Sequence, residues 1–322
     1  MTDAPTLTVV IPVRNGARTI GDTLTGLMHQ APSPIIREIV VVDDGSTDAT
    51  RAVVQKFPVT LLTEAGHGPA AARNRGLHAA RGAIVAHLDA DTLPTRRWLA
   101  EIAAPFSDPA VNQVAGRMLG LRPATPAERY YARRFLDCEA DNASAEGFPF
   151  AAAGNMAVRR AAALAVGGWD AAFRVGQDVD LSYRLRQRFG SPIRYQAAAV
   201  VFVRTSRTLP ELRARAFKYG QGRAKLWLCY RDAAGWGAQR SVRIAGSLLL
   251  SALGPHLLRT ARWAGRATDH DVDDAECHRA WTWSLWRGFA SMLRHREWRQ
   301  LHPHDAGHAQ PSGVALTRRR PE

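Results

Sequence analysis

The amino-acid sequence predicts an α/β fold that ends in a helical extension, and two observations support this. Short apolar runs typical of buried strands alternate with helix-like segments up to about residue 120. The last third of the chain instead shows helical periodicity. With 322 residues, 46% of them hydrophobic and 22% charged, the chain is long and apolar enough to bury a substantial core.

The strand signals are continuous apolar runs, which are typical of strands buried on both faces. The expected strands are Leu7–Ile11, Ile39–Val42, Val59–Thr63, Ile84–Leu88 and, further along, Ile193–Val203. Helix-like segments follow the first three of these strands and the last one. They cover Thr19–Gln30, Asp48–Lys56, the Ala-rich stretch that Gly82 closes, and residues 209–230.

The chain is expected to divide into three parts. A main domain over residues 1–225 precedes a basic, Trp-rich helical extension over residues 226–302 and a disordered tail over residues 303–322. No leader or membrane span is expected, because the longest apolar stretch, Ile244–Leu258, falls short of the ~20 residues that a bilayer needs. The three cysteines lie far apart, which argues against a disulfide framework. These features predict a cytoplasmic protein.

The net positive charge is concentrated in the last third of the chain. Residues 204–322 hold 21 Lys and Arg against 10 Asp and Glu, whereas residues 1–203 hold 22 against 19. A basic segment suits an anionic partner such as a phosphate-bearing ligand, an anionic membrane surface or a nucleic acid. A solubilising surface would explain the same charge.

An amphipathic pattern runs from Trp281 to Trp298. Its apolar side fits a helix that lies in a membrane interface, and it fits equally a helix docked on its own domain. Residues 241–298 are therefore the candidate contact with the inner face of the cell membrane. The residues on the apolar side are Trp281, Leu285, Trp286, Phe289, Met292 and Leu293.

Polar side chains gather just past the ends of the expected strands. In open α/β sheets, ligands bind in the crevice at those ends. A single Asp after a strand is usually a helix cap, but two acidic strand ends and a third that carries Asn, all in one sheet, make capping a weaker explanation. Two carboxylates one residue apart repel each other, and a bound cation would remove that repulsion. The residues concerned are Asn15, Asp43, Asp44, Asp89 and Asp91.

A second polar cluster lies in the stretch from Phe150 to Gly190. Asp178 can begin a helix in which Leu181 and Leu185 recur at helical spacing. Asp178 and Asp180 can then be partners of the helix dipole and nothing more.

Five motifs occur together and in order, and the set resembles the inverting glycosyltransferases of family 2. The resemblance covers roughly residues 5–225. It implies a GT-A fold, in which a mixed sheet is flanked by helices, and transfer of a sugar from a nucleoside diphosphate sugar. The motifs read TVVIPVRNGARTI, IVVVDDGSTDAT, GPAAARNRG, AHLDADT and GNMAVRR…VGGWD…GQDVDLSYRL.

The resemblance assigns the donor-binding positions to the first four motifs. It implies that Asp44 accepts a hydrogen bond from the nucleobase and that Asp91, with Asp89, holds Mn²⁺ or Mg²⁺ against the diphosphate. Such a hard cation suits carboxylate and phosphate oxygens. The implied donor-binding residues are Pro12, Val13, Arg14, Asn15, Asp43, Asp44, Arg73, Asn74, Asp89 and Ala90.

The fifth motif is implied to carry the catalysis and the acceptor. Asp178 would take the proton of the acceptor hydroxyl as its oxygen attacks the anomeric carbon, and a single displacement inverts the configuration. A Trp face in this motif can stack on a sugar. The implied acceptor-binding residues are Gly154, Asn155, Gly168, Trp169, Asp170 and Gln177.

The sequence departs from the family pattern at three positions. Gln177 stands where the family usually has Glu before the catalytic Asp. Val203 stands where many members have a His that completes the metal site, and Arg14 where some have an aromatic residue that stacks on the base.

The resemblance predicts a cell-envelope or glycoconjugate enzyme with a glycan or lipid-linked acceptor. The alternative is a non-catalytic nucleotide-sugar-binding or glycan-binding scaffold on the same fold. The first strand–helix turn lacks the GxGxxG of dinucleotide-binding oxidoreductases and the glycine-rich basic loop of nucleotidyltransferases. No nucleic-acid partner is expected, because the excess charge lies outside the α/β region and no nucleic-acid-reading motif is found.

Overall fold

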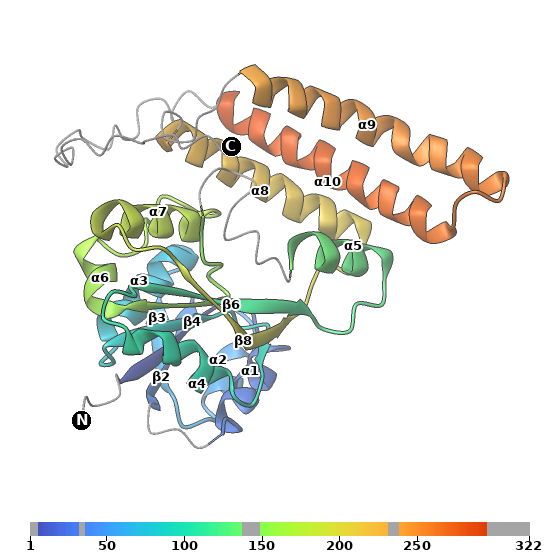
Figure 1. The fold of residues 1–322 in the computed structure, drawn as a ribbon. Helices are drawn as coiled ribbons and strands as arrows, with labels where there is room; N and C mark the ends of the chain where they lie inside the picture. Colours follow the sequence, from blue (N-terminus) through green and yellow to red (C-terminus); the bar gives the residue numbers. More distant parts are fainter. Residues whose placement is uncertain (1–5, 32–35, 137–148, 231–237, 295–322) are drawn as a thin grey trace.

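The computed structural model describes residues 6–31, 36–136, 149–230 and 238–294 (Figure 1). A sheet flanked by helices forms one body, and a layer of long helices covers one end of it. The expected tail over residues 303–322 lies outside the described residues. The predicted boundary after residue 225 falls inside one continuous helix, so the division into domains stays a prediction.

The strands and helices expected in the first part of the chain are confirmed, with shifted ends. β1 and β2 extend beyond their apolar runs, because the pairing with neighbouring strands continues through Pro12 in β1 and Asp44 in β2. The elements are β1 (Leu7–Val13), α1 (Ile20–Met28), β2 (Ile36–Asp44), α2 (Thr50–Val54), β3 (Thr60–Glu64), α3 (Pro69–Ala79) and β4 (Ile84–Leu88).

The middle of the chain holds several elements that the sequence analysis did not anticipate. They are β5 (Thr92–Pro94), α4 (Trp98–Ala103), the 3₁₀ helix η1 (Ala104–Ser107), β6 (Gln113–Gly120), α5 (Pro126–Phe135), β7 (Asn155–Arg159) and α6 (Arg160–Ala165). The expected elements resume with α7 (Gln177–Phe189), β8 (Arg194–Val203) and α8 (Leu209–Tyr230). Two long helices follow, α9 (Ala238–Trp263) and α10 (Asp269–Arg294).

The strands form one mixed sheet in the order β3-β2-β1-β4-β7-β6-β8-β5. β3, β2, β1 and β4 are parallel, so their carboxyl ends meet at one edge. β7 runs antiparallel to β4 and pairs Asn155 with Leu88. The residues just before β7 therefore lie beside those just after β4, and the predicted motifs come together at this edge.

Two apolar clusters cover the two faces of the sheet. Successive residues of β1 alternate between them: Val9 and Ile11 face one cluster, and Val10 faces the other. All three are fully buried. This is why the strand reads as a continuous apolar run, as parallel strands covered on both faces do.

The helix α10 packs along α8 at two glycines. A Cβ on Gly220 would lie 1.9 Å from the carbonyl oxygen of Leu285, and one on Gly288 would lie 2.0 Å from that of Phe217. Trp281, Leu285 and Phe289, on the apolar side of α10, are consequently buried. Of the two alternatives for this side of α10, docking on the protein itself is the one that these three residues show, and the membrane contact of residues 241–298 stays a prediction. None of the described helices is long and apolar enough to span a bilayer.

Candidate active site

The carboxyl end of β2 places Asp44 against the loop before α3. Its Oδ2 accepts a 3.0 Å hydrogen bond from the backbone N–H of Gly68, whose φ of 103° favours glycine. Its Oδ1 is buried and has no hydrogen-bond partner among the described residues. A buried carboxylate oxygen without a donor is costly, so this atom is positioned to accept a hydrogen bond from a ligand.

Its neighbour Asp43 has its hydrogen-bonding capacity filled by the protein. The fully buried carboxylate accepts the backbone N–H of Ser46 at 3.0 Å and pairs with Arg51. Burial alone would favour the neutral acid, but these hydrogen bonds and the Arg51 charge hold the pKa of Asp43 below its ordinary value. Asp43 stabilises the turn after β2, and both of its carboxylate oxygens already have a partner in the protein.

The turn after β1 is joined to the turn after β2. Asn15, at a φ of 51°, donates its backbone N–H to Ser46 Oγ at 2.9 Å and accepts the backbone N–H of Thr47 at 2.9 Å. Val13 is buried and Arg14 is exposed beside this turn. The predicted grouping of Pro12, Val13, Arg14 and Asn15 near Asp44 is therefore seen, whereas their contact with a base stays a prediction.

Arg73 lies at the centre of the site. Its Nη2 donates a 2.7 Å hydrogen bond to Asp89 Oδ1, and its guanidinium lies 5.0 Å from the Trp169 ring centre. Nε and Nη1 are buried without a hydrogen-bond partner among the described residues. His87, also buried, packs edge-on against the same ring at 5.0 Å, and burial lowers its pKa so that it is held neutral. Two donors of Arg73 thus remain for an anionic ligand.

The negative charge of Asp91 is in an unfavourable environment. Burial, together with repulsion from Asp89, raises the pKa of Asp91 to about 6, although the charges of Arg215 and Arg204 oppose this. Among the described residues, three or more potential metal ligands do not come together anywhere. Asp89 and Asp91 are therefore the two carboxylates that lie here, and other oxygen ligands, such as those of phosphate or water, would have to complete a hard-cation site.

Asp178 lies in the first turn of α7, after Gly176. Its carboxylate accepts the backbone N–H groups of Ala153 at 3.2 Å and of Val179 at 3.0 Å. Burial raises the pKa of Asp178, while these hydrogen bonds and the charge of Arg73 lower it in part. A carboxylate made more basic by burial suits a general base.

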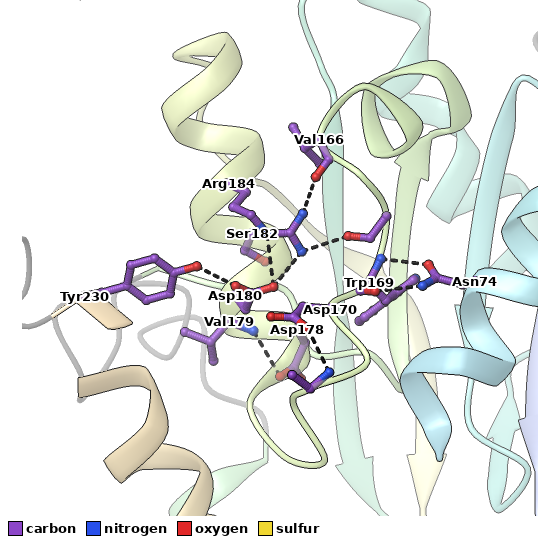
Figure 2. A network of polar contacts seen from close by, with 12 residues as sticks. Asn74, Val166, Trp169, Asp170, Asp178, Val179, Asp180, Ser182, Arg184 and Tyr230 are labelled. Atoms are coloured by element: carbon purple, nitrogen blue, oxygen red, sulfur yellow. Dashed lines mark hydrogen bonds and ion pairs between the residues drawn. The ribbon is translucent and has the colours of Figure 1, made fainter. Parts of the chain in front are cut away.

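A buried polar network connects α7 to its surroundings (Figure 2). Asp180, two residues after Asp178, is fully buried and receives Arg184 Nη2 and Tyr230 Oη, each at 2.5 Å. Arg184 also donates to the backbone carbonyls of Val166 and Gly168. Asp180 was considered only as a helix-dipole partner in the sequence, yet it links α7, α8 and the loop before α7.

Asn74 of α3 holds the loop before α7 in place through its side-chain amide. Its Oδ1 accepts the backbone N–H of Trp169 at 2.8 Å, and its Nδ2 donates to the Trp169 carbonyl at 2.7 Å (Figure 2). A Cβ on Gly168 would lie 2.5 Å from the same amide oxygen. Each end of the Asn74 amide thus has one partner in the protein, and the expected contact of Asn74 with the donor stays a prediction.

Asn155 and Trp169 also differ from their expected roles in binding an acceptor. The buried Asn155 amide accepts Trp98 Nε1 at 2.7 Å and donates to the carbonyls of Arg117 and Ala199. Trp169 is buried as well, and Arg73 covers its ring. Neither side chain is exposed to a sugar. Asn155 instead contacts Trp98, and Trp169 packs against Arg73.

The remaining predicted positions lie around this centre. A Cβ on Gly154 would lie 2.9 Å from Asp89 Oδ2, so this glycine allows the close approach of β7 to β4. Asp170 accepts the backbone N–H of Ala172, and Gln177 has a buried Oε1 without a hydrogen-bond partner among the described residues. Ala90 uses its carbonyl to accept the Thr23 hydroxyl.

Residues 8–167, about half of the chain, match the sequence model of the family described as glycosyl transferase family 2. The match includes Asp44, Arg73, Asp89 and Asp91, which the fold brings to one edge of the sheet. The chain belongs to glycosyltransferase family 2.

Named relatives of this family 2 chain come from bacteria and archaea. A pre-mycofactocin glycosyltransferase of Mycobacterium tuberculosis is 34% identical over 235 residues, which are 70% of this chain and 48% of that protein. The glycosyltransferase AglE of Haloferax volcanii is 28% identical over 235 residues, 70% of this chain and 76% of AglE. The chain thus spans about half the length of the mycobacterial relative.

Solved structures show the GT-A fold expected for family 2. The mannosyltransferase PcManGT from Pyrobaculum calidifontis, in complex with GDP-Man and Mn²⁺, aligns with a TM-score of 0.64 at 20% identity over 91% of this chain and 88% of that one. Glucosyl-3-phosphoglycerate synthase from Mycobacterium tuberculosis, with Mn²⁺, UDP and glucosyl-3-phosphoglycerate, aligns with a TM-score of 0.52 at 21% identity, over 72% and 81% of the two chains. At these identities the likeness concerns the fold.

The departure of this family 2 chain at Val203 can be located in the sheet. Val203 is buried in β8 and pairs with Thr92, the residue after Asp91. The isopropyl group of Val203 has no atom that can bind a metal ion. The charged groups that instead influence Asp91 belong to Arg204 and to Arg215 of α8. Arg215 lies over the Tyr131 ring at 4.8 Å. The sequence contains no motif that marks Arg215 in advance.

Proposed function

We propose that the protein is a glycosyltransferase that moves a sugar from a nucleoside diphosphate sugar to an acceptor hydroxyl with inversion. The observation that carries this proposal is the meeting of three groups at one sheet edge. They are the unpartnered Asp44 oxygen, the Asp89–Asp91 pair beside Arg73, and the half-buried carboxylate of Asp178. A base pocket, a diphosphate site and a general base are what such a reaction needs.

The donor is a nucleoside diphosphate sugar whose base faces Asp44. The free Oδ1 of Asp44 can accept an N–H of uracil, thymine or guanine, and the two free nitrogens of Arg73 can bind phosphate. Solved structures with this fold contain GDP-Man or UDP, which is consistent with such a donor.

A divalent cation, Mn²⁺ or Mg²⁺, is proposed to bind at Asp91 with Asp89. The pair fits this ion, because burial and the neighbouring Asp89 charge raise the pKa of Asp91 to about 6, and a bound cation would offset both effects. Such an ion supplies Lewis-acid stabilisation of a diphosphate leaving group. Two structures with this fold were solved with Mn²⁺.

Asp178 is proposed to act as the general base. Its carboxylate takes the proton from the acceptor hydroxyl while that oxygen forms a bond to the anomeric carbon and the bond to the diphosphate oxygen breaks. The nucleoside diphosphate leaves with the electron pair, and the configuration inverts. The backbone N–H groups of Ala153 and Val179 hold the carboxylate in place for this step.

The acceptor is proposed to be a glycan or a lipid-linked molecule of the cell envelope or of another glycoconjugate. Such acceptors are found at membranes, and residues 204–322, which include the extension, hold 21 Lys and Arg against 10 Asp and Glu. A peripheral contact with the inner face of the cell membrane through residues 241–298 is part of this proposal. It rests on α9, since the apolar side of α10 is buried.

The second candidate function is a non-catalytic scaffold that binds nucleotide sugars or glycans. Val203 favours it, because the metal site lacks the His that many members of the family have. The two candidates differ in turnover, while both allow nucleotide binding.

The test is a panel of UDP-, GDP- and dTDP-sugars, with and without Mn²⁺, on wild type and Asp91→Ala. Thermal shifts report binding, because a ligand at 100 Kd raises stability by about 2.7 kcal/mol. Release of nucleoside diphosphate reports transfer. An Mn²⁺-dependent shift and release for one base, both lost in Asp91→Ala, are expected. A shift without release for any sugar and acceptor would favour the scaffold.

A further inference from the structure

Two arginines lie beside Asp91 at the carboxyl edge of the sheet. β5 and β8 are antiparallel and pair Thr92 with Val203. The next position of the same register places Arg204 opposite Asp91. The other arginine is Arg215 of α8. Burial raises the pKa of Asp91, and the charges of Arg215 and Arg204 oppose this rise, so both guanidinium groups act on the same carboxylate.

Arg204 has a nitrogen that the protein does not use. Its Nη2 donates a 2.6 Å hydrogen bond to Asp22 in α1. The next residue of α1, Thr23, donates its hydroxyl to the carbonyl of Thr92 at 2.7 Å, so α1 is fixed beside the turn that carries Asp91. Nη1 of Arg204 is buried and has no hydrogen-bond partner in the part of the chain that the structure describes. A buried N–H without an acceptor is costly, so this nitrogen is positioned to donate to a ligand.

Arg215 is held by an aromatic ring of α5. Its guanidinium lies 4.8 Å from the ring centre of the buried Tyr131, whose hydroxyl is 3.1 Å from that of Tyr219. A cation–π contact uses none of the N–H donors of an arginine, so N–H groups remain for a ligand. Burial alone would lower the pKa of Arg215, but the two tyrosines and Asp91 raise it above its ordinary value. The positive charge is therefore kept.

Neither arginine forms an ion pair with Asp91, although the structure describes all three side chains. All three are half-buried, so solvent and ligands can reach them. Opposite charges that influence each other without touching can both be satisfied by a ligand between them. Phosphate oxygens suit the guanidinium groups, and a hard cation bound to phosphate suits the carboxylate.

We propose that Arg204 and Arg215 bind the diphosphate of the donor and supply much of the positive charge that neutralises it. Val203 has no atom that can bind a metal ion, so the charge of the leaving group depends more on these arginines. When the bond from the anomeric carbon to the diphosphate oxygen breaks, that oxygen keeps the electron pair. The guanidinium N–H groups stabilise the charge that develops there. This inference rests on the proposed function, because it requires a diphosphate donor.

A phosphate on the acceptor would offer the same chemistry, but the charges favour the donor. The arginine charge that acts on the proposed base, Asp178, is that of Arg73. Arg204 and Arg215 act on Asp91, which lies at the diphosphate side of the site. The two arginines therefore belong with the leaving group, and a nucleoside diphosphate is expected to bind them even without a divalent cation.

The experiment is calorimetric titration of the full chain with UDP, GDP and dTDP, in EDTA and in Mn²⁺. Wild type is expected to bind one of them in EDTA with a Kd within about tenfold of its Kd in Mn²⁺. Arg215→Met and Arg204→Met should each weaken this binding in EDTA about 10- to 100-fold, because a charged hydrogen-bond donor to phosphate is lost. Arg215→Lys keeps the charge and should lose less. The matched control is Arg213→Met, which removes the same charge from an exposed position of α8 and should bind as wild type does.

The nucleoside without phosphate separates a diphosphate contact from general damage to the site. At millimolar concentration it should shift the melting temperature of wild type and of all variants equally. Circular dichroism checks that each variant folds, and Arg215→Lys carries the test if Arg215→Met does not fold.

Two results would overturn the inference and leave the proposed function standing: wild type that binds nucleoside diphosphate only with Mn²⁺, or Arg215→Met and Arg204→Met that bind it in EDTA as tightly as wild type. A loss that extends equally to the nucleoside would also overturn it. A wild type that binds none of the three nucleoside diphosphates in either condition would count against the proposed function and this inference together.

Discussion

The hydroxyl of Tyr230, the last residue of α8, donates a 2.5 Å hydrogen bond to the buried carboxylate of Asp180 in α7 (Figure 2). The other oxygen of that carboxylate receives Arg184, which holds the carbonyls of Val166 and Gly168. The helix that carries Asp178 is thereby tied both to the start of the extension and to the loop beside Arg73. The position of the proposed base thus depends on side chains that touch no substrate.

Replacing Tyr230 with Phe is expected to lower the free energy of unfolding by about 1–3 kcal/mol, because one Asp180 oxygen is left buried without this donor. The ring stays in place against Tyr183, 4.3 Å away between centres. Urea denaturation measures the stability. We also expect kcat to fall while the Kd for nucleoside diphosphate stays the same. Unchanged stability and kcat would show that the hydroxyl positions nothing.

Asp43 and Asp44 are adjacent in sequence and are expected to respond differently to the same change. Asp44→Asn removes a charged acceptor from the only unpartnered oxygen of this pair, so nucleoside diphosphate should bind about 10- to 100-fold more weakly. Asp43→Asn removes the negative charge that pairs with Arg51, so it should cost about 1–2 kcal/mol of stability and leave the Kd near wild type. Calorimetric titration and urea denaturation of both variants test this. Equal losses of affinity would contradict it.

Local patterns in the sequence predicted much of the sheet and the acidic positions. The run Leu7–Ile11 is apolar because both faces of β1 are covered, and such a signal needs no knowledge of distant residues. Asp44 and Asp91 were noticed because more than one strand of the same sheet ends in carboxylates, whereas the role of Asp178 came from the resemblance to family 2. An Asp at a helix start is common, so the local pattern alone could not single out Asp178.

The roles of several amides and rings could not be predicted, because their partners are remote in sequence. Asn74 bonds to Trp169, 95 residues away, and Asn155 bonds to Trp98, 57 residues away. A motif marks such an amide but does not tell whether it faces a ligand or the protein. The apolar side of α10 presented the same ambiguity, since a membrane and α8 require the same pattern. Burial against α8 decided it.

Removing metal is expected to reveal the cost of the buried Asp91 charge, to which burial contributes most and repulsion by Asp89 adds. The pKa of Asp91 is about 6 in the folded protein against the ordinary 3.8, so the folded state keeps a proton that the unfolded chain has lost. Asp91 therefore costs nothing below about pH 3.8, and its cost grows to on the order of 2–3 kcal/mol above about pH 6. In EDTA, Asp91→Asn should be more stable than wild type at pH 7.5.

The comparison at two pH values provides the control. The difference between Asp91→Asn and wild type should shrink as pH falls to about 4, because wild-type Asp91 is then largely protonated as well. Added Mn²⁺ should stabilise wild type and have little effect on the variant. Urea denaturation measures all four conditions. A wild type that is the more stable of the two in EDTA at pH 7.5 would contradict the predicted repulsion.

Replacing Asp178 with Asn separates an enzyme from a scaffold. The amide is nearly the same size and can still accept a hydrogen bond from Ala153 or Val179, but it cannot take a proton. Turnover should fall roughly 10²- to 10⁴-fold, while the Kd for nucleoside diphosphate stays within a few-fold of wild type. In wild type, kcat should rise with pH through an apparent pKa above 3.8, since burial makes this carboxyl harder to ionise. Nucleoside diphosphate release across pH measures both effects, and turnover equal to wild type in Asp178→Asn would remove Asp178 from the mechanism.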